Sequence, residues 1–172
     1  MTDMVKDLLE QLDALSPMPD DDDASIETLQ RYEEIVEQLV MYNDPRCIQP
    51  LIESFGYIDG YGLYWSTMHL IETFAVEETS PLLIKALNHE NKGTRLWATR
   101  MLMRSQNNEV FPKLITLLAD EAEHVRAEAA LALSGFGELK ARGFLERLRD
   151  DSSEEVRSTV IPILAEWNQE NG

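Results

Sequence analysis

The sequence predicts an all-α protein, a right-handed α-solenoid in which stacked helical hairpins follow an N-terminal helix pair. Two sets of residues recur every 31 positions: Tyr64, Arg95, Arg126 and Arg157 form one set, and Pro50, Pro81 and Pro112 form the other. A period of this length is typical of repeat proteins, in which each repeat buries its apolar face only against its neighbours. With 172 residues and 44% hydrophobic content, the chain suits one such stack, counted as a single structural domain.

The first expected helix covers residues 2–15. Its apolar residues recur at spacings of three and four, as on one face of an amphipathic helix. They are Met4, Leu8, Leu12 and Leu15. Thr2 or Asp3 can cap this helix. Pro17 and Pro19 end it, because proline disfavours the helical conformation in the residue before it.

An acidic linker and a second helix complete the N-terminal pair. Four adjacent aspartates at residues 20–23 repel each other, which predicts a solvated loop. Ser25 or Asp23 then caps a helix that runs to Tyr42. The residues expected to be buried are Ile26, Leu29, Ile35, Val36, Leu39 and Val40, and the outer face carries Glu27, Glu33, Glu34 and Glu37. Residues 1–42 are thus expected to form an acidic hairpin that caps the repeats.

Four repeats are expected within residues 43–172, each made of a short helix, a loop and a second helix. They cover about 44–77, 80–106, 108–137 and 138–167. In the second helices one apolar position recurs, occupied by Ile71, Leu102, Leu133 and Leu164. Asp44-Pro45 and Ser80-Pro81 are predicted helix starts, since proline is favoured in the first turn of a helix.

The third repeat resembles a known family. Residues 108–115, Asp120, Val125-Arg126 and residues 129–133 are similar to the short HEAT-like repeat, the variety also found in phycobilisome lyases and many bacterial scaffolds. A second match starts at residue 44, so the resemblance covers residues 44–167. It implies a solenoid of helical hairpins. It implies no particular function, because many functions share this scaffold.

The family pattern also implies a role for the recurring arginines. The arginine that opens each second helix pairs with an acid in the turn before it. Arg126 with Asp120 and Arg157 with Asp151 fit this arrangement, whereas Tyr64 replaces the arginine in the first repeat. We therefore interpret the arginines as structural residues rather than as ligand-binding residues.

The net charge of −17 is unevenly distributed along the chain. Residues 1–42 carry 12 acids and two bases, whereas residues 80–107 carry one acid and five bases. An acidic surface repels nucleic acid and speeds the encounter with basic proteins. Solubility alone is the alternative explanation of this acidity.

The single cysteine and the N-terminal residues bear on the cellular location. Cys47 excludes an internal disulfide framework and suits a reducing compartment. Its place on an apolar stripe favours a buried inert thiol over a nucleophile. The first residues lack a secretion signal, and no apolar run has the length of a membrane span. We therefore expect a cytoplasmic protein that does not bind a membrane.

The first repeat departs from the pattern in the segment at residues 56–65. Three glycines there allow unusual backbone angles. The candidate partner-binding residues of this segment are Tyr57, Asp59, Tyr61, Tyr64 and Trp65. Tyrosine and tryptophan are favoured at the centres of protein interfaces. The alternative is that these rings pack over the junction between the N-terminal pair and the first repeat.

The second helices are expected to line the concave face of the solenoid. Further candidates for partner binding are His69, Trp97 and Arg100 on that face, and Glu33, Glu34 and Glu37 on the acidic hairpin. An exposed Trp97 could anchor a partner. A neighbouring repeat could equally cover it.

The sequence patterns of catalysis and metal binding are missing. The three histidines do not pair at metal-ligand spacing, and His69 with Glu72 supplies too few ligands for a metal site. The glycines at residues 56–62 do not follow a strand, which excludes a nucleotide-binding fingerprint. We therefore expect no catalytic residue, no metal and no cofactor.

Three functions remain open on the sequence. The favoured one is a non-catalytic protein-binding module, in its sharper form a bacterial immunity protein that neutralises a basic, nuclease-like toxin with its carboxylates. The second is a scaffold or assembly subunit that uses the same surface. The third is an enzyme of the lyase type, for which the catalytic residues are missing. We expect a monomer when the protein is free, and no bound nucleic acid.

Overall fold

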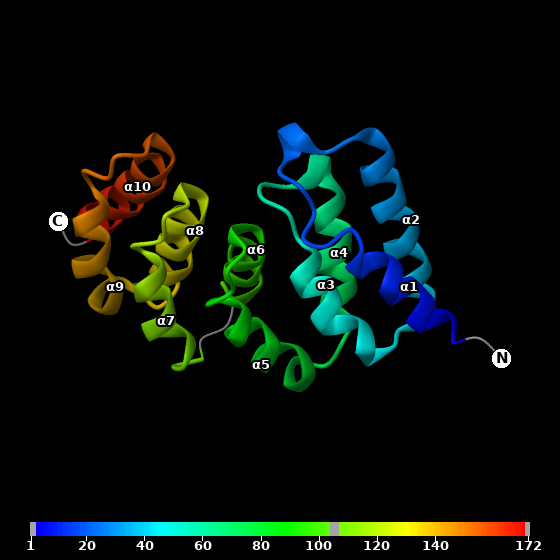
Figure 1. Ribbon diagram of the computed structural model, residues 1–172. Coiled ribbons are helices and arrows are strands. Elements are labelled where there is room, and N and C mark those ends of the chain that lie inside the picture. Colours follow the sequence, from blue (N-terminus) through cyan, green and yellow to red (C-terminus); the bar gives the residue numbers. More distant parts are fainter. Residues whose placement is uncertain (1–2, 104–106, 171–172) are drawn as a thin grey trace. The chain divides into compact units, whose positions relative to one another are not determined.

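The computed structural model describes residues 3–103 and 107–170, and every regular element in these ranges is helical (Figure 1). The prediction of an all-α fold is confirmed. The chain divides into two compact units, Met1–Ala98 and Thr99–Gly172. Positions 2 and 106, where the sequence placed the first helix start and the end of the second repeat, lie outside the described residues.

Each unit packs its helices against neighbours in the chain. The first unit holds α1 (Met4–Asp13), α2 (Ile26–Tyr42), α3 (Ile48–Ser54), α4 (Leu63–Glu72), α5 (Val76–Ala86) and the start of α6 (Lys92–Leu102). The second unit holds α7 (Val110–Leu117), α8 (Glu123–Ser134), α9 (Glu138–Leu145) and α10 (Glu154–Glu170). In the first unit α1 packs on α2 and α3, and α4 packs on α2, α3 and α5. In the second unit α8 contacts α7, α9 and α10.

Asp3 caps α1 as the sequence predicts. Its carboxylate accepts a hydrogen bond from the amide of Lys6 at 3.4 Å. The buried face of the helix consists of Val5, Leu8 and Leu12. The predicted burial of Met4 is wrong, because Val5 shares the face of Leu8 and Leu12 and leaves Met4 51% exposed.

The second helix, α2, begins after Ser25, whose hydroxyl accepts a hydrogen bond from the amide of Thr28 at 3.2 Å. Its buried residues are Tyr32, Ile35, Val36 and Leu39. The predicted burial of Ile26 and Val40 is wrong, since they are 71% and 52% exposed. The packed stripe covers only the middle of α2, so residues near both ends of the helix face solvent.

Tyr32, which the sequence stripe omitted, ties α2 to α3 and α4. Its hydroxyl lies 3.0 Å from Ser54 Oγ and 2.8 Å from Thr67 Oγ1. Its ring meets that of Tyr64 edge on, with 5.7 Å between the centroids. Burial raises the pKa of Tyr32 from 10.0 to about 12, because the phenolate would lose its hydration, and the two hydrogen bonds offset only part of this effect.

We expect the protein to lose stability between about pH 10 and about pH 12. In the unfolded chain Tyr32 ionises near its ordinary pKa of about 10, whereas in the folded protein it keeps its proton until about pH 12. The unfolded state therefore binds fewer protons in this interval, and the free energy of unfolding falls as the pH rises. For Tyr32 alone the loss is roughly 2–3 kcal/mol.

Urea unfolding at about pH 9 and about pH 11.5 measures this loss. Tyr32→Phe removes the titrating hydroxyl and keeps the ring, so its free energy of unfolding should fall less between the two pH values. An equal fall in both proteins would contradict the assignment to Tyr32.

The 31-residue period is visible in the second helices α6, α8 and α10, which begin at positions 92, 123 and 154. In α6, Nη1 of Arg95 donates to the carbonyl oxygens of His89 and Glu90, at 2.9 and 2.8 Å. Arg126 and Arg157 make the same pair of hydrogen bonds to the carbonyls six and five residues before them. Each arginine thus satisfies backbone acceptors of the turn before its helix, and the structural interpretation of these residues is confirmed.

The acid partner of Arg126 differs from the family expectation. Nε and Nη2 of Arg126 bind the Asp151 carboxylate in the following turn, at 3.0 and 2.8 Å, whereas Asp120 supplies only its backbone carbonyl to Nη1. Arg157 pairs with Glu154 and takes only the backbone carbonyl of Asp151. The turn carbonyls occupy Nη1 in both arginines, so the other guanidinium donors bind a different carboxylate, Asp151 for Arg126 and Glu154 for Arg157.

Of the two predicted proline starts, one is confirmed and one is wrong. Asp44 caps the short 3-10 turn Pro45–Cys47, which leads directly into α3. Pro81 lies inside α5, because that helix already begins at Val76. Two glutamates in the first turn of α5 stabilise the earlier start, since the helix N-terminus carries a partial positive charge.

Candidate protein-binding surface

A cluster of buried aromatic rings supports the segment at residues 56–65. Phe55 stacks on Trp97 with 5.0 Å between the ring centroids and 14° between the ring planes. Tyr64 meets both rings edge on, at 5.7 and 5.8 Å. All three residues have an exposed fraction of 0%. Tyr64 therefore occupies the position that an arginine holds in the later repeats, and it packs its ring in the core there.

Two glycines let the backbone of the turn lie against this cluster. A β-carbon on Gly56 would overlap the Tyr64 hydroxyl, and one on Gly60 would lie 2.7 Å from the Tyr64 ring. Gly60 also has a φ of +59°, which favours glycine. In addition, Nε1 of the buried Trp97 donates a hydrogen bond to the carbonyl oxygen of Ile58 in this turn, at 3.0 Å. The turn is therefore held in one place by packing and by a buried hydrogen bond.

The acidic linker lies on this turn, which the sequence did not predict. Asp20 forms an ion pair with Lys92 at 2.6 Å. Oδ1 of Asp21 accepts a hydrogen bond from the Gly60 amide at 3.0 Å, and its carbonyl accepts one from the Tyr61 hydroxyl at 3.1 Å. The prediction of a solvated loop is wrong for Asp20 and Asp21, because these partners offset the repulsion within the run. The next two aspartates are exposed.

The aromatic residues predicted to bind a partner divide into buried and exposed ones. Tyr64 and Trp97 are wholly buried, and Tyr57 is 8% exposed. Tyr61 and Trp65 are 68% and 42% exposed. Of the two alternatives left open for Trp97, exposure and burial, the structure shows burial, because the aromatic cluster covers its ring. Among these five residues, only Tyr61 and Trp65 offer a partner a substantial contact area.

The side chain of Trp65 is 42% exposed, but its ring packs against a buried neighbour. Its ring rests edge on against Trp97, with 5.3 Å between the centroids and 82° between the planes. Trp65 lies in the first turn of α4, where Tyr64 anchors the helix in the core. A half-exposed ring that is already held in place loses little conformational freedom when a partner covers it.

A small groove of about 40 Å³ lies between α2 and α4, which lie side by side (Figure 1). Its lining comprises Tyr32, Glu33, Val36 and Glu37 of α2 with Leu63 and Ser66 of α4. At the C-terminal ends of the two helices, Thr73 Oγ1 donates a hydrogen bond to Asn43 Oδ1 at 3.2 Å. We use the name α2–α4 face for the exposed residues of α2, of α4 and of the turn before α4 that the sequence predicted to bind a partner, namely Glu33, Glu34, Glu37, Tyr61, Trp65 and His69.

The negative charge of this face is only partly neutralised. Glu34 pairs with Arg31 at 2.8 Å, and His69 lies 3.1 Å from Glu72. Within the described ranges Glu33 and Glu37 have no ion-pair partner. Of the 12 carboxylates in residues 1–42, four form ion pairs, and the other eight have none with any described residue. The acidity of the first 42 residues therefore remains available to a partner.

Two further predicted residues have structural partners. The backbone carbonyl of Asp59 accepts hydrogen bonds from the amides of Gly62 and Tyr64, at 3.1 and 3.3 Å, so Asp59 shapes the turn. Arg100 belongs to the second unit and pairs there with Glu128 at 3.1 Å. Both remain predictions as contact residues.

The described residues also bear on other chemistries. Among them, no three His, Cys, Asp or Glu side chains lie close enough together to hold a metal ion. None of the helices in these ranges has the length and apolar character needed to span a membrane. Cys47 is a buried free thiol whose pKa is raised mainly by burial, which makes it a poor nucleophile.

Helical hairpins whose second helices start at a fixed interval define a helical repeat protein. Residues 80–165, half of the chain, match HEAT repeats, and the protein belongs to this family. The predicted HEAT-like α-solenoid is thereby confirmed, with a fold typical of protein-binding scaffolds. The match starts at residue 80, so the aromatic turn lies outside it.

The chain was also compared with curated proteins and with solved structures. No curated protein matches the chain in sequence. A similar solved structure is a designed armadillo repeat protein in complex with the peptide (KR)4. It has 18% sequence identity and a TM-score of 0.49, and the alignment covers 94% of this chain and 80% of that chain.

Proposed function

We propose that this HEAT-repeat protein binds a basic protein through the α2–α4 face and neutralises it, and that the partner is a nuclease-like toxin. One observation carries the proposal. Trp65, which packs on Trp97, precedes the groove residue Ser66 in α4, and the α2 side of that groove carries the carboxylates of Glu33 and Glu37, which no described cation neutralises.

Charge supports the choice of a basic partner. The unpaired carboxylates of residues 1–42 create a negative potential that attracts cationic surfaces and raises the rate of encounter. A nuclease has a positively charged cleft, because its substrate carries one phosphate charge per nucleotide. Carboxylates that enter such a cleft replace the phosphates and block access of the substrate.

The aromatic residues support a stable complex rather than a transient encounter. Binding energy in protein interfaces concentrates in a few residues, with tryptophan and tyrosine enriched among them. Trp65 and Tyr61 are the exposed rings of this face, and both are held by contacts behind them. In this arrangement charge guides the partner to the face, and Trp65 slows its release.

A scaffold or assembly subunit is the second candidate. Extended binding surfaces without catalysis are the usual use of HEAT repeats, and the same face could hold a basic partner without inhibiting it. The two functions differ in one measurable outcome, which is whether the partner loses its own activity in the complex.

The proposal is tested by identifying and assaying the partner. The protein, immobilised at low salt, captures its partner from cells that carry its gene, and the purified partner is then assayed for cleavage of DNA and RNA. We expect a basic protein whose cleavage activity is lost at a one-to-one molar ratio. A basic partner that stays active in the complex would favour the scaffold, and an acidic partner would refute the electrostatic argument.

Removing two charges from the face should slow binding. For the double variant Glu33→Gln with Glu37→Gln we expect the association rate at low salt to fall about tenfold, because electrostatic steering is weakened. Surface plasmon resonance at low and high salt measures this effect, which should shrink as salt screens the charges. The matched control is Glu77→Gln with Glu78→Gln on exposed positions of α5, which changes the net charge equally. Equal slowing by both variants would locate the steering elsewhere.

Trp65→Ala in the same assay should weaken binding mainly through faster dissociation. A loss of about 2 kcal/mol, or roughly 30-fold in Kd, is the size expected for an interface anchor. Circular dichroism melting of the variant checks that the fold is kept. A variant that folds normally and dissociates at the unchanged rate would exclude Trp65 as the anchor.

A further inference from the structure

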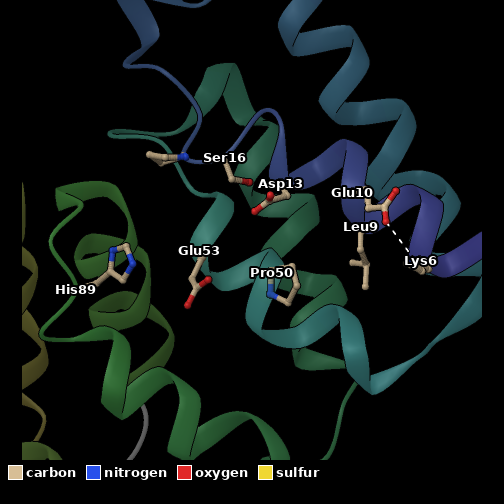
Figure 2. Close-up of a pocket in the computed structure, with 9 residues that line it drawn as sticks. Lys6, Leu9, Glu10, Asp13, Ser16, Pro50, Glu53 and His89 are labelled. Atoms are coloured by element: carbon tan, nitrogen blue, oxygen red, sulfur yellow. Dashed lines mark ion pairs between the residues drawn. The ribbon is translucent and has the colours of Figure 1, made fainter.

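The first unit has a second hollow, of about 440 Å³ (Figure 2). It shares no lining residue with the α2–α4 face. Glu10 and Asp13 of α1 lie above Glu53 and Pro50 of α3 in Figure 2, with His89 and Lys6 toward opposite ends of the hollow. Its volume falls in the range of small-molecule sites. Asp13 is one of the unpaired carboxylates of residues 1–42, but no residue of this hollow belongs to the α2–α4 face.

The hollow combines apolar walls with three carboxylates. Leu9, Pro17 and Pro50 provide the apolar surface. The Asp13 carboxylate has no ion-pair or hydrogen-bond partner among the described residues, and the Glu53 carboxylate accepts a hydrogen bond from the neutral amide of Gln49 at 2.8 Å. Apolar surface with a few charged groups is the usual composition of a site for an organic ligand.

The remaining carboxylate, that of Glu10, forms only a weak, exposed ion pair with Lys6. Lys6 lies 3.5 Å from it, and the two side chains are 69% and 66% exposed. Exposed pairs of this kind contribute little and are readily exchanged. With three carboxylates and one ammonium, the lining carries a net charge of −2 when His89 is neutral. The hollow therefore favours a ligand with positive charge.

The spread of these carboxylates selects the kind of cation. Within the described ranges, no three acidic or histidine side chains converge closely enough for a metal ion. Glu10 and Asp13 project from α1, whereas Glu53 projects from α3 toward the His89 end (Figure 2). Separate charges joined by apolar surface match a chain of methylene groups that ends in an ammonium group.

We propose that this hollow binds an alkylammonium chain, supplied by a free polyamine or by a lysine side chain of another protein. One ammonium group binds between Asp13 and Glu53. The methylene groups lie on Pro50 and Leu9. A second ammonium group, where the ligand has one, reaches Glu10 and displaces Lys6.

Isothermal titration calorimetry with spermidine on the full chain tests the proposal. We expect saturable one-to-one binding that Asp13→Asn with Glu53→Gln weakens at least tenfold. The control, Asp22→Asn with Asp23→Asn, removes two exposed charges of the linker and should change the affinity less than twofold. Glu33→Gln with Glu37→Gln should also leave spermidine binding unchanged, which separates this site from the α2–α4 face.

Further ligands identify the source of the ammonium group. A lysine-containing peptide that competes with spermidine and binds more tightly would assign the site to a protein side chain, and the reverse order would assign it to free polyamines. Mg²⁺ at the same concentration should not displace spermidine. Absence of saturable binding, equal weakening by both double variants, or full displacement by Mg²⁺ would overturn the proposal.

Discussion

Replacement of Gly93 by alanine is expected to destabilise the protein by about 3 kcal/mol or more. Gly93 lies in the first turn of α6, where the helix backbone touches the turn of the first repeat. A β-carbon at this position would overlap the carbonyl group of Gly56 and lie 2.7 Å from the carbonyl oxygen of Phe55. Backbone atoms cannot rotate away as the end of a side chain can, so the helix and the turn would have to separate.

The matched control is Gly143→Ala. Gly143 lies inside α9, and a β-carbon there would meet no atom within 4 Å. Alanine is favoured over glycine in a helix by about 1 kcal/mol, so this variant should be slightly more stable than the parent protein. Urea unfolding followed by circular dichroism measures both variants. If Gly93→Ala proved as stable as Gly143→Ala, the close approach of α6 to the turn would be refuted.

Trp97→Ala is expected to cost about 3–5 kcal/mol. The substitution removes the ring that stacks on Phe55 and supports Tyr64 and Trp65. It also removes the hydrogen bond to the carbonyl oxygen of Ile58, whose φ of +76° is rare for a residue with a branched side chain. Such a loss is a large part of the total stability of a domain of this size.

Trp97→Phe separates packing from hydrogen bonding. Phenylalanine keeps most of the stacking area but cannot donate to Ile58, so about 1–2 kcal/mol should be lost. Trp167→Ala in α10 is the control, since this ring is only half-buried and should cost less than Trp97→Ala. Unfolding in urea gives all three values. A Trp97→Ala variant no less stable than Trp167→Ala would mean that the aromatic cluster does not hold the first unit together.

Both substitutions also bear on the proposed binding surface. Gly93 and Trp97 place the turn at residues 56–62 and the ring of Trp65, although neither residue is exposed. A loosened turn would leave Trp65 free to move and raise the entropic cost of binding. Weaker partner binding by Trp97→Phe is therefore expected even under conditions where the variant is fully folded.

Local patterns were sufficient to predict several elements. Ser25 caps α2 and Asp3 caps α1 because capping depends on the residue and its next few neighbours. The arginine period was readable because each arginine bonds to carbonyls only five and six residues before it. The start of α5 was misjudged, since Pro81 is tolerated inside the helix and the acids of the first turn act earlier in the chain.

The candidate site was only partly predictable. The sequence drew attention to the aromatic turn and to the acidic linker as separate features, and the structure joins them through Asp20, Asp21 and Lys92. Lys92 is 72 residues from Asp20, and no local spacing rule connects them. The exposure of Trp65 and the burial of Trp97 likewise depend on which rings meet in space.

By itself, the order of residues determined the helical class, the 31-residue repetition, the main caps and the acidic character of the first 42 residues. These properties follow from interactions over a few positions and from composition, which need no knowledge of distant contacts. Only the tertiary structure decided which aromatic rings face solvent, where the linker lies and which carboxylates remain unpaired. Those outcomes depend on contacts between residues far apart in the chain, where packing and desolvation outweigh local preference.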